Sequence, residues 1–371
     1  MATAKTRHAW RAGAAIAALA LLNAPALRAQ ETGTRVVPTH QTVITGYGTV
    51  GYAFETQGEN KNAFTSSVNP IFLFQFMDKV LFEVEFEFEL EGGITETGLE
   101  YAQLDVLLTD NITLVGGKFL LPFGVFGERL HPTWINKFAT SPPIYGHHVA
   151  AFGAEPLLPI LSDVGFMARG TVTPGRWNLS LNGFVTQGPD VEAGGDPAEP
   201  ELVFPGSSED NNTNKMLGGR VDISLPPWFE INGSLINGDY DTNNFLDFTA
   251  WNVAGELRLK NVEIRGEYLQ TRLEIETATG FPTIRRHGFY AQAAYRVGPF
   301  EPVFRWTQVF DTREDGVVTA EDGAWQAGFG IDYWFSPSIV LMAGFELNRE
   351  DGLPIDEIDN DRLVAHIAFG F

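Results

Sequence analysis

The sequence predicts an all-β chain that folds into a transmembrane antiparallel β-barrel of about sixteen strands, with a long inward-folded third loop. Three observations support this fold class. From about Val43 onward, segments of roughly ten residues alternate between apolar and polar side chains. The connections between these segments alternate between short turns and longer polar loops. Beyond the N-terminal segment, no apolar run approaches the ~20 residues that a spanning helix requires.

The N-terminal segment has the order of a secretory signal peptide. Three basic residues precede an alanine- and leucine-rich run, and small residues follow up to Ala29. This order is typical of an export signal, and the apolar run is too short for a membrane anchor. We expect residues 1–29 to be the signal peptide, with cleavage after Ala29 favoured over Ala26. A disordered or helical tail is the alternative.

The remaining chain is expected to hold an N-terminal periplasmic segment (residues 30–42) and the barrel (residues 43–371). Its charge is strongly negative. The whole sequence has 25 Lys and Arg against 47 Asp and Glu, and removing the four bases of the signal peptide changes the net charge from −22 to −26. Such a field is a poor match for nucleic acid. It favours cations, small hydrophilic solutes, outer-membrane lipid, and lipopolysaccharide through bridging divalent ions. Cysteine is absent, so disulfides cannot stabilise the fold.

The clearest strand reads VLFEVEFEFELE, from Val80 to Glu91. Large apolar side chains alternate with five glutamates, which gives a strand one apolar and one acidic face. A half-buried strand of a soluble protein is one interpretation. The other, which the rest of the chain favours, is that the phenylalanine face contacts lipid and the glutamate face contacts water inside a barrel. The sixteen strands are expected at residues 43–55, 65–76, 80–91, 98–108, 111–120, 163–172, 175–187, 215–225, 228–238, 247–259, 262–273, 286–297, 300–311, 323–335, 338–349 and 361–371.

Short turns at one end and long loops at the other are typical of outer-membrane barrels. Pro226-Pro227 and Lys260-Asn261 are tight connections, whereas residues 188–214 form a long polar one. A soluble sandwich of many strands would not need this asymmetry. Aromatic residues beside the short turns predict an interfacial girdle of Trp177, Trp228, Phe300, Trp334 and Phe335.

The last expected strand reads LVAHIAFGF, and its final residue is Phe371. Its apolar residues alternate up to that phenylalanine. This ending resembles the carboxy-terminal insertion signature of bacterial outer-membrane proteins. Together with the export signal and the strand pattern, it predicts a location in the bacterial outer membrane.

The octet Gly117–Gly124 reads GKFLLPFG and resembles a segment of the phosphate-selective porin superfamily, in which a Gly-x-Phe-x-x-Pro-Phe-Gly pattern closes a strand ahead of the third loop. The resemblance covers this octet and the barrel architecture of about residues 43–371. It implies a pore-forming barrel of sixteen strands that assembles as a homotrimer. The anion-selective members depend on a lining rich in Lys and Arg. This chain lacks such a lining, so phosphate specificity is not carried over.

The longest insertion, residues 121–162, follows this octet and corresponds to the third loop. Its aromatic residues argue against disorder, and long loops in compact proteins are usually functional. Pro132 is expected to open a short helix that extends to Asn136 or Phe138. The resemblance implies that the loop folds inward and narrows the pore. An ordered cap over the outside of the barrel mouth is the alternative.

Side-chain parity predicts the residues that line the pore if the glutamates face inward. The acidic lining residues are Glu83, Glu85, Glu87, Glu89 and Asp105. The basic lining residues are Arg169, Arg176, Arg220, Arg258, Arg265, Arg296 and Arg305. The constriction loop contributes Glu128, Arg129, His131, Lys137, His147 and His148. This separation predicts a transverse field and a weak cation preference. Alternatively, the charges only keep the lumen hydrated and brace the loop, with Arg129 or Lys137 contacting the glutamates of residues 83–91.

The predicted function is therefore a porin that allows passive diffusion of small hydrophilic solutes and ions, without enzymatic activity and without a cofactor. No nucleophile elbow, P-loop, HExxH motif or dinucleotide fingerprint occurs in the sequence. No metal site is expected, because His147-His148 has no acidic partners at metal-ligand spacing. Two alternatives remain open. One is an outer-membrane enzyme that uses Ser162, Asp163 and His148, and the other is a plugged structural or adhesive barrel.

Overall fold

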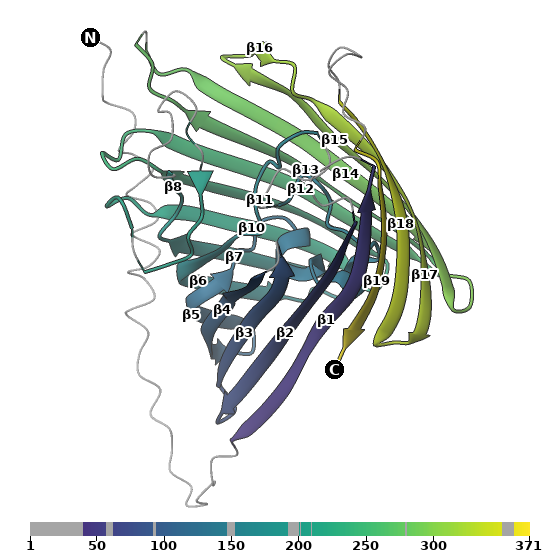
Figure 1. Cartoon of the computed structure of the whole chain (residues 1–371). Coiled ribbons are helices and arrows are strands. Elements are labelled where there is room, and N and C mark those ends of the chain that lie inside the picture. Colours follow the sequence, from purple (N-terminus) through teal and green to yellow (C-terminus); the bar gives the residue numbers. More distant parts are fainter. Residues whose placement is uncertain are drawn as a thin grey trace, which may run out of the picture. The chain divides into compact units, whose positions relative to one another are not determined.

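The computed structural model of the chain describes residues 40–56, 62–91, 94–146, 153–191, 200, 202–208, 210–278, 280–350 and 360–371 (Figure 1). The expected signal peptide and nearly all of the expected periplasmic segment lie outside these residues. The described residues belong to one compact unit, Thr39–Phe371.

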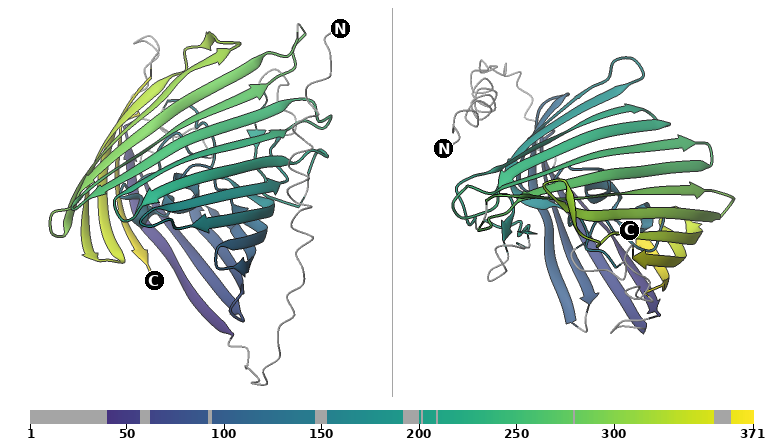
Figure 2. Two further views of the ribbon diagram at one scale, coloured as in Figure 1. Left: turned by 180° about the vertical axis from the view of Figure 1, so that it is seen from behind. Right: turned by 90° about the horizontal axis from the view of Figure 1, so that it is seen from above.

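The unit is a closed antiparallel barrel (Figures 1 and 2). Each barrel strand pairs with the next one along the chain, and β1 pairs with β19 to close the sheet. The sixteen barrel strands are β1 (Gln41–Glu55), β2 (Asn62–Phe76), β3 (Val80–Glu91), β4 (Ile94–Thr109), β5 (Ile112–Leu120), β6 (Ser162–Val172), β7 (Asn178–Thr186), β10 (Met216–Leu225), β11 (Phe229–Asp239), β12 (Asp247–Leu259), β13 (Val262–Glu274), β14 (Thr283–Tyr295), β15 (Phe300–Glu314), β17 (Ala324–Ser336), β18 (Ile339–Glu350) and β19 (Arg362–Gly370). The predicted fold class and strand order are confirmed.

Three further short strands lie outside the barrel wall. The strand β16 (Val317–Ala320) pairs with the end of β15 and forms the seventeenth strand of the sheet. The strands β8 (Asp190–Val191) and β9 (Leu202–Val203) form a separate two-stranded sheet in the connection between β7 and β10. A closed sheet leaves no barrel strand with an unpaired edge, which removes the usual site of edge-to-edge aggregation.

The two faces of each barrel strand differ in the way that the alternating sequence predicts. On β3, Phe86 and Phe88 are exposed, whereas Glu85 on the opposite face is buried. The same alternation of exposed and buried residues continues along β11 and β15. The exposed face therefore carries large apolar side chains all around the barrel, which in water would be an unfavourable surface and in a bilayer a favourable one.

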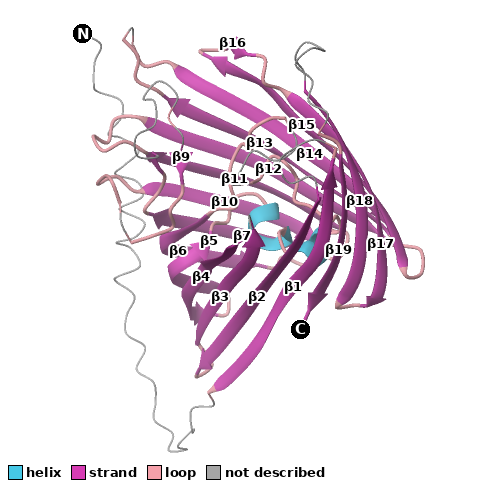
Figure 3. Ribbon diagram, in the orientation of Figure 1, coloured by secondary structure: helices cyan, strands magenta, loops and turns pink. Residues whose placement is uncertain are grey.

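The long loop, defined here as residues 121–161, connects β5 to β6 and folds into the barrel (Figure 3). It contains the π-helical turn η2 (Phe126–Leu130) and the short helix α2 (Thr133–Asn136). Pro132 precedes α2, and Lys137 ends it in the left-handed conformation with φ 62°. The predicted short helix after Pro132 is confirmed. Among the residues that the structure describes, no helix is both long and apolar enough to cross a bilayer.

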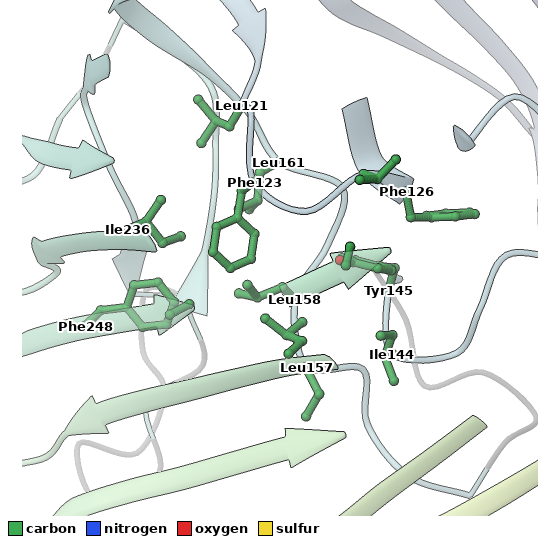
Figure 4. Close-up of a cluster of buried hydrophobic side chains, with 14 of the residues drawn as sticks. Leu121, Phe123, Phe126, Ile144, Tyr145, Leu157, Leu158, Leu161, Ile236 and Phe248 are labelled. Atoms are coloured by element: carbon green, nitrogen blue, oxygen red, sulfur yellow. The ribbon is translucent and has the colours of Figure 1, made fainter. Parts of the chain in front are cut away.

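The hydrophobic core lies inside the barrel, between the long loop and the inner faces of the strands (Figure 4). The loop contributes Leu121, Phe123, Phe126, Ile144, Tyr145, Leu157, Leu158 and Leu161, and the strands contribute residues such as Ile236 and Phe248. Each large apolar side chain that is fully buried contributes about 1.5–3 kcal/mol of transfer free energy. The loop is therefore packed against the wall as part of a core, and it is not a cap over the outside of the mouth.

Two predicted positions differ near the short turns. The strand β7 begins at Asn178, so Arg176 lies in the preceding turn, because Pro174 and Gly175 (φ 68°) extend that turn by several residues. Trp334 was expected in the outer aromatic girdle. Its Nε1 instead donates a hydrogen bond to Glu301 on the inner face (2.9 Å). Trp334 shares the inner face with Asp332, two residues earlier on β17, because the register of the strand shifts only after Trp334.

Candidate functional site

The inner wall has two regions. The covered wall, formed by the inner faces of β10–β15 and β17–β19, carries the long loop, and arginines on it donate hydrogen bonds to backbone carbonyls of the loop. In the order of the loop carbonyls, Gly124 accepts from Arg220 (2.8 Å), Asn136 from Arg265, Thr140 from Arg305 (2.7 Å) and Pro156 from Arg286 (3.1 Å). A loop inside a barrel needs such donors because its carbonyls have no strand partners.

These contacts correct the predicted basic lining. Arg220, Arg265 and Arg305 do face inward, but only 5%, 4% and 0% of each residue is exposed. The loop lies over them. They therefore support the loop, and they do not form an open basic surface opposite the acidic residues.

Glu267 on β13 is the acceptor for one end of the loop. Its Oε1 accepts from the backbone N–H of Phe126 (2.7 Å) and the Tyr290 hydroxyl (3.0 Å). Its Oε2 accepts from the backbone N–H of Val125 (3.1 Å), the Tyr145 hydroxyl (2.8 Å) and the Asn252 amide (3.1 Å). A buried carboxylate is costly unless donors compensate it, and here five donors do so. Glu267 joins the loop to three strands.

A second anchor surrounds the segment after α2. Arg305 on β15 donates to the Thr140 hydroxyl (2.8 Å) and to Glu346 on β18 (3.2 Å). Glu346 also accepts from Arg362 on β19 (2.7 Å). The guanidinium group of Arg305 lies 4.2 Å from the centre of the Phe138 ring, which is a cation–π distance.

Three glycines make room for Phe138. A Cβ atom at Gly328, Gly330 or Gly344 would approach the Phe138 ring to 2.8, 3.0 or 3.1 Å. These distances are shorter than ordinary van der Waals contact. The glycines on β17 and β18 therefore form a shallow surface that fits this one aromatic side chain of the loop.

The charged residues of the loop pair with the covered wall. Glu128 contacts Arg220 (2.5 Å), and Lys137 contacts Glu263 (2.9 Å) and Glu301 (3.1 Å). Arg129 pairs with Glu230. The expectation that Arg129 or Lys137 contacts the glutamates of residues 83–91 is wrong, because the loop lies against strands on which acids and arginines alternate.

His131 connects the loop to β1. Its Nδ1 lies 2.6 Å from the Gly127 carbonyl oxygen, and its Nε2 lies 3.2 Å from the Tyr47 hydroxyl. Burial lowers the pKa of His131 from 6.5 to about 4, against a smaller opposing effect of the Gly127 carbonyl. The ring is therefore neutral at pH 7, with Nδ1–H donating to the carbonyl and Nε2 facing the Tyr47 hydroxyl, which also hydrogen-bonds Glu85. His147 and His148 lie outside the described residues.

The acidic wall, formed by the inner faces of β2–β4, is the other region. It carries the glutamate row, which comprises Glu83, Glu85, Glu87 and Glu89 on β3, with Asp105 on β4. Glu85 and Asp105 are buried, Glu83 and Glu87 are partly exposed, and Glu89 is exposed. Gln103 donates to Asp105 (2.9 Å) and Asn69 to Glu87 (3.5 Å). Within the described part of the chain, no Lys, Arg or His forms an ion pair with Glu83, Glu85, Glu87 or Asp105.

Of the remaining predicted bases, Arg169 lies beside the loop and is also near enough to Glu83 and Asp105 to interact with them electrostatically. Arg169 on β6 lies 3.8 Å from Glu128 of the loop. Arg258 on β12 is 54% exposed and pairs with Glu256 (2.5 Å) and Glu263 (3.4 Å). Near the short turns, the guanidinium groups of Arg176 and Arg296 lie 5.5 and 4.9 Å from the ring centres of Trp228 and Trp334.

The comparisons with known proteins agree on the fold. No protein-family model and no curated protein matches the chain. Among solved structures, OmpF of Salmonella typhi in complex with daunomycin matches with a TM-score of 0.60 and 13% identity, over 89% of this chain and 97% of that chain. An anion-selective porin from Comamonas acidovorans matches with a TM-score of 0.59 and 12% identity, over 90% and 100%. The trimer form of in-vitro folded OmpT from Vibrio cholerae matches with a TM-score of 0.56 and 11% identity, over 90% and 99%. The chain thus has the porin fold.

Sequence reasoning missed the two loop anchors. Glu267 accepts from the loop backbone and two tyrosines, and nothing in the local sequence around it indicates these partners. Glu346 and Phe138 were not assigned a role. A signal was present for the second anchor, because Gly328, Gly330 and Gly344 leave the inner face of β17 and β18 without side chains at three neighbouring positions.

Proposed function

We propose that the protein is an outer-membrane diffusion channel of bacteria, through which small hydrophilic solutes and ions pass passively. The proposal is supported by the porin fold, by the apolar outer face of the barrel, and above all by the contrast between the two inner walls. The loop lies against the covered wall, and it forms no described hydrogen bond or ion pair with Glu83, Glu85 or Glu87. Hydrated carboxylates on the acidic wall would then line one side of the passage. The exposed part of the loop would line the other side.

We further propose a weak preference for cations. Same-face neighbours along a strand are about 7 Å apart, so Glu87 and Glu89 lie close together and Glu83 lies beyond the buried Glu85. These accessible glutamates make a negative surface that concentrates cations. Three of the arginines that would oppose this effect, Arg220, Arg265 and Arg305, are buried under the loop. Arg169 and Arg258 remain accessible, which is one reason that the proposed preference is weak. The Comamonas acidovorans porin is described as anion-selective, so the proposed preference would distinguish this chain from a protein of the same fold. Reversal potentials in a KCl gradient test it, and clear anion selectivity would contradict it.

Liposome swelling with sugars of graded size tests the channel itself. Purified protein in liposomes should admit small sugars quickly and larger ones progressively more slowly. Swelling no faster than in protein-free liposomes, with protein insertion verified, would contradict the proposal.

A plugged structural barrel is the second candidate, and a specific observation favours it. The loop packs an apolar core inside the barrel, with Phe126, Ile144 and Leu158 among its buried residues, and such packing would also suit a loop that closes the passage. The swelling assay separates the two candidates, because a plugged barrel admits no sugar of any size.

Three further expectations form part of the proposal. Assembly as a homotrimer is supported by the trimer form of the Vibrio cholerae structure, and native gels with chemical cross-linking test it. Export through residues 1–29 is supported by the signal-peptide pattern. A closer relationship to the phosphate-selective porin superfamily is supported by the octet Gly117–Gly124.

A further inference from the structure

Three arginines form a row across the strands β13, β14 and β15. Arg272 is the direct cross-strand partner of Arg285, and Arg285 is the direct partner of Arg313. Like charges at directly opposed positions destabilise a sheet. Within the described part of the chain, none of the three forms an ion pair with a carboxylate. This arrangement is unfavourable for the protein alone, which suggests that an anion completes it.

The row faces outward, away from the lumen. The next residue after Arg285 is Arg286, whose guanidinium donates to the loop inside the barrel (2.8 Å to the Glu155 carbonyl). Since successive side chains point to opposite faces, Arg285 points outward. Arg272 and Arg313 share its face because they are its direct partners.

The row lies one membrane thickness from the short-turn end. Arg272 is ten residues beyond Val262, the first residue of β13. At about 3.3 Å per residue and a strand tilt of about 45°, ten residues rise roughly 23 Å, close to the ~25 Å apolar band of an outer-membrane barrel. The connection after β13, residues 275–282, is on the long-loop side. The arginines therefore lie where acyl chains end and the headgroups of the outer leaflet begin.

Aromatic side chains on the same face border the row. The Trp251 and Tyr268 rings are 5.1 Å apart, and the His287 ring stacks on Phe310 at 4.8 Å. With the Gln270 amide oxygen turned toward them, Trp251 Nε1 and Arg272 Nε both donate to that oxygen (3.0 Å each). These contacts orient Arg272 and give the bound molecule an apolar surface below the charges.

The guanidinium groups have donors left for a ligand. Within the described part of the chain, the guanidinium groups of Arg285 and Arg313 donate no hydrogen bond, and because their Nε atoms are buried, a ligand would contact their terminal nitrogens. The forked guanidinium group matches the oxygens of a phosphate in a bidentate manner, more specifically than an ammonium group does. Three such groups in a row suit a headgroup that carries more than one phosphate.

We propose that Arg272, Arg285 and Arg313 bind the phosphate groups of lipopolysaccharide directly, with its acyl chains along the aromatic surface below. This inference rests on the proposed location in the outer membrane and is independent of conduction. It differs from attraction through bridging divalent ions, because the contact requires no metal.

The experiment compares two double variants with the same change in net charge. R285Q/R313Q removes two charges of the row, and the control K79Q/K260Q removes two exposed charges from short turns at the opposite end of the barrel. The probe is diphosphoryl lipid A in detergent with EDTA present, followed by native mass spectrometry and by tryptophan fluorescence. The apparent Kd of R285Q/R313Q should rise at least ten-fold, and that of the control should change less than two-fold. Lipid A without phosphates should bind the wild-type protein at least ten-fold more weakly.

Several results would overturn the proposal. One is equal binding by R285Q/R313Q and the wild type. Another is displacement of lipid A by millimolar inorganic phosphate, which would assign the row to free phosphate. A third is a change of oligomeric state in R285Q/R313Q with unchanged lipid A affinity, which would assign the row to contact with a second copy. Unchanged conductance verifies that the variant is folded. If R285Q/R313Q does not fold, R285K/R313K keeps the charge and should show a smaller but measurable loss of affinity.

Discussion

The covered wall and the acidic wall use charged residues in opposite ways. On the covered wall, Arg305 and Glu346 are both 0% exposed, and each has several hydrogen-bond partners. On the acidic wall, Glu83 and Glu87 keep access to solvent and form no ion pair among the described residues, although Arg169 is near enough to Glu83 for an electrostatic interaction. A buried charge must be compensated by neighbours, whereas a hydrated charge needs no partner and remains available to ions.

This difference separates stability from selectivity. Charges on the covered wall hold the long loop, so their loss should be measured as a change in unfolding free energy and in the position of the loop. Charges on the acidic wall contribute little to stability, and their loss should be measured as a change in ion preference. Matched substitutions on the two walls therefore test this difference.

The largest effect is expected for Glu267→Ala on the covered wall. The substitution leaves two backbone N–H groups and two tyrosine hydroxyls without their acceptor in a buried site. Loss of one member of a buried charged network costs about 3–5 kcal/mol. The temperature at which the folded band disappears on a semi-native gel should fall by several degrees, and single-channel conductance should rise because the loop is released.

Glu256→Ala is the matched control for this prediction. Glu256 lies on the inner face of the neighbouring strand β12, and it pairs with the exposed Arg258. Its substitution should leave both measurements close to the wild type. Equal effects of the two substitutions would show that Glu267 has no special role in holding the loop.

The second prediction compares Arg305 and Arg258, both of which side-chain parity in the sequence predicts to be basic pore-lining residues. Arg305→Ala removes the donors to Thr140 and the cation over Phe138, and it should lower the unfolding free energy by about 3 kcal/mol. Arg258→Ala removes an exposed ion-pair member and should change it by less than about 0.5 kcal/mol. Denaturant unfolding in detergent micelles measures both. A difference below 1 kcal/mol would contradict the distinction.

The third prediction concerns ion preference. Glu83→Gln with Glu87→Gln should lower the cation-to-anion permeability ratio about two-fold, with no loss of stability, because both carboxylates are accessible. Glu85→Gln is the control on the same strand. Glu85 is only 2% exposed, so its substitution should change the ratio much less. A larger change from Glu85 than from the pair would place the ion path elsewhere.

Local pattern was sufficient for the barrel but insufficient for the loop. The alternation in Val80–Glu91 fixes a strand and its two faces, since a one-residue slip would place every phenylalanine on the acidic side. The burial of Arg305 could not be read in the same way. Parity shows that Arg305 faces inward, but its partners are Thr140, more than 160 residues away along the chain, and Glu346. Only the path of the loop decides which inward charges stay hydrated.

The smallest effect is expected at His131, where the loop meets β1 beside the acidic wall. Its folded pKa of about 4 lies below its ordinary 6.5, so the docked loop binds fewer protons than a released loop between these pH values. Docking is therefore fully stable above pH 6.5 and weakens as the pH falls toward 4. Current fluctuations from loop motion should increase between pH 7 and pH 4.5 in the wild type. His131→Gln keeps the contact with Tyr47 possible but cannot gain a proton, so its fluctuations should depend less on pH. An equal pH dependence in both proteins would show that carboxylates, and not this imidazole, control the loop.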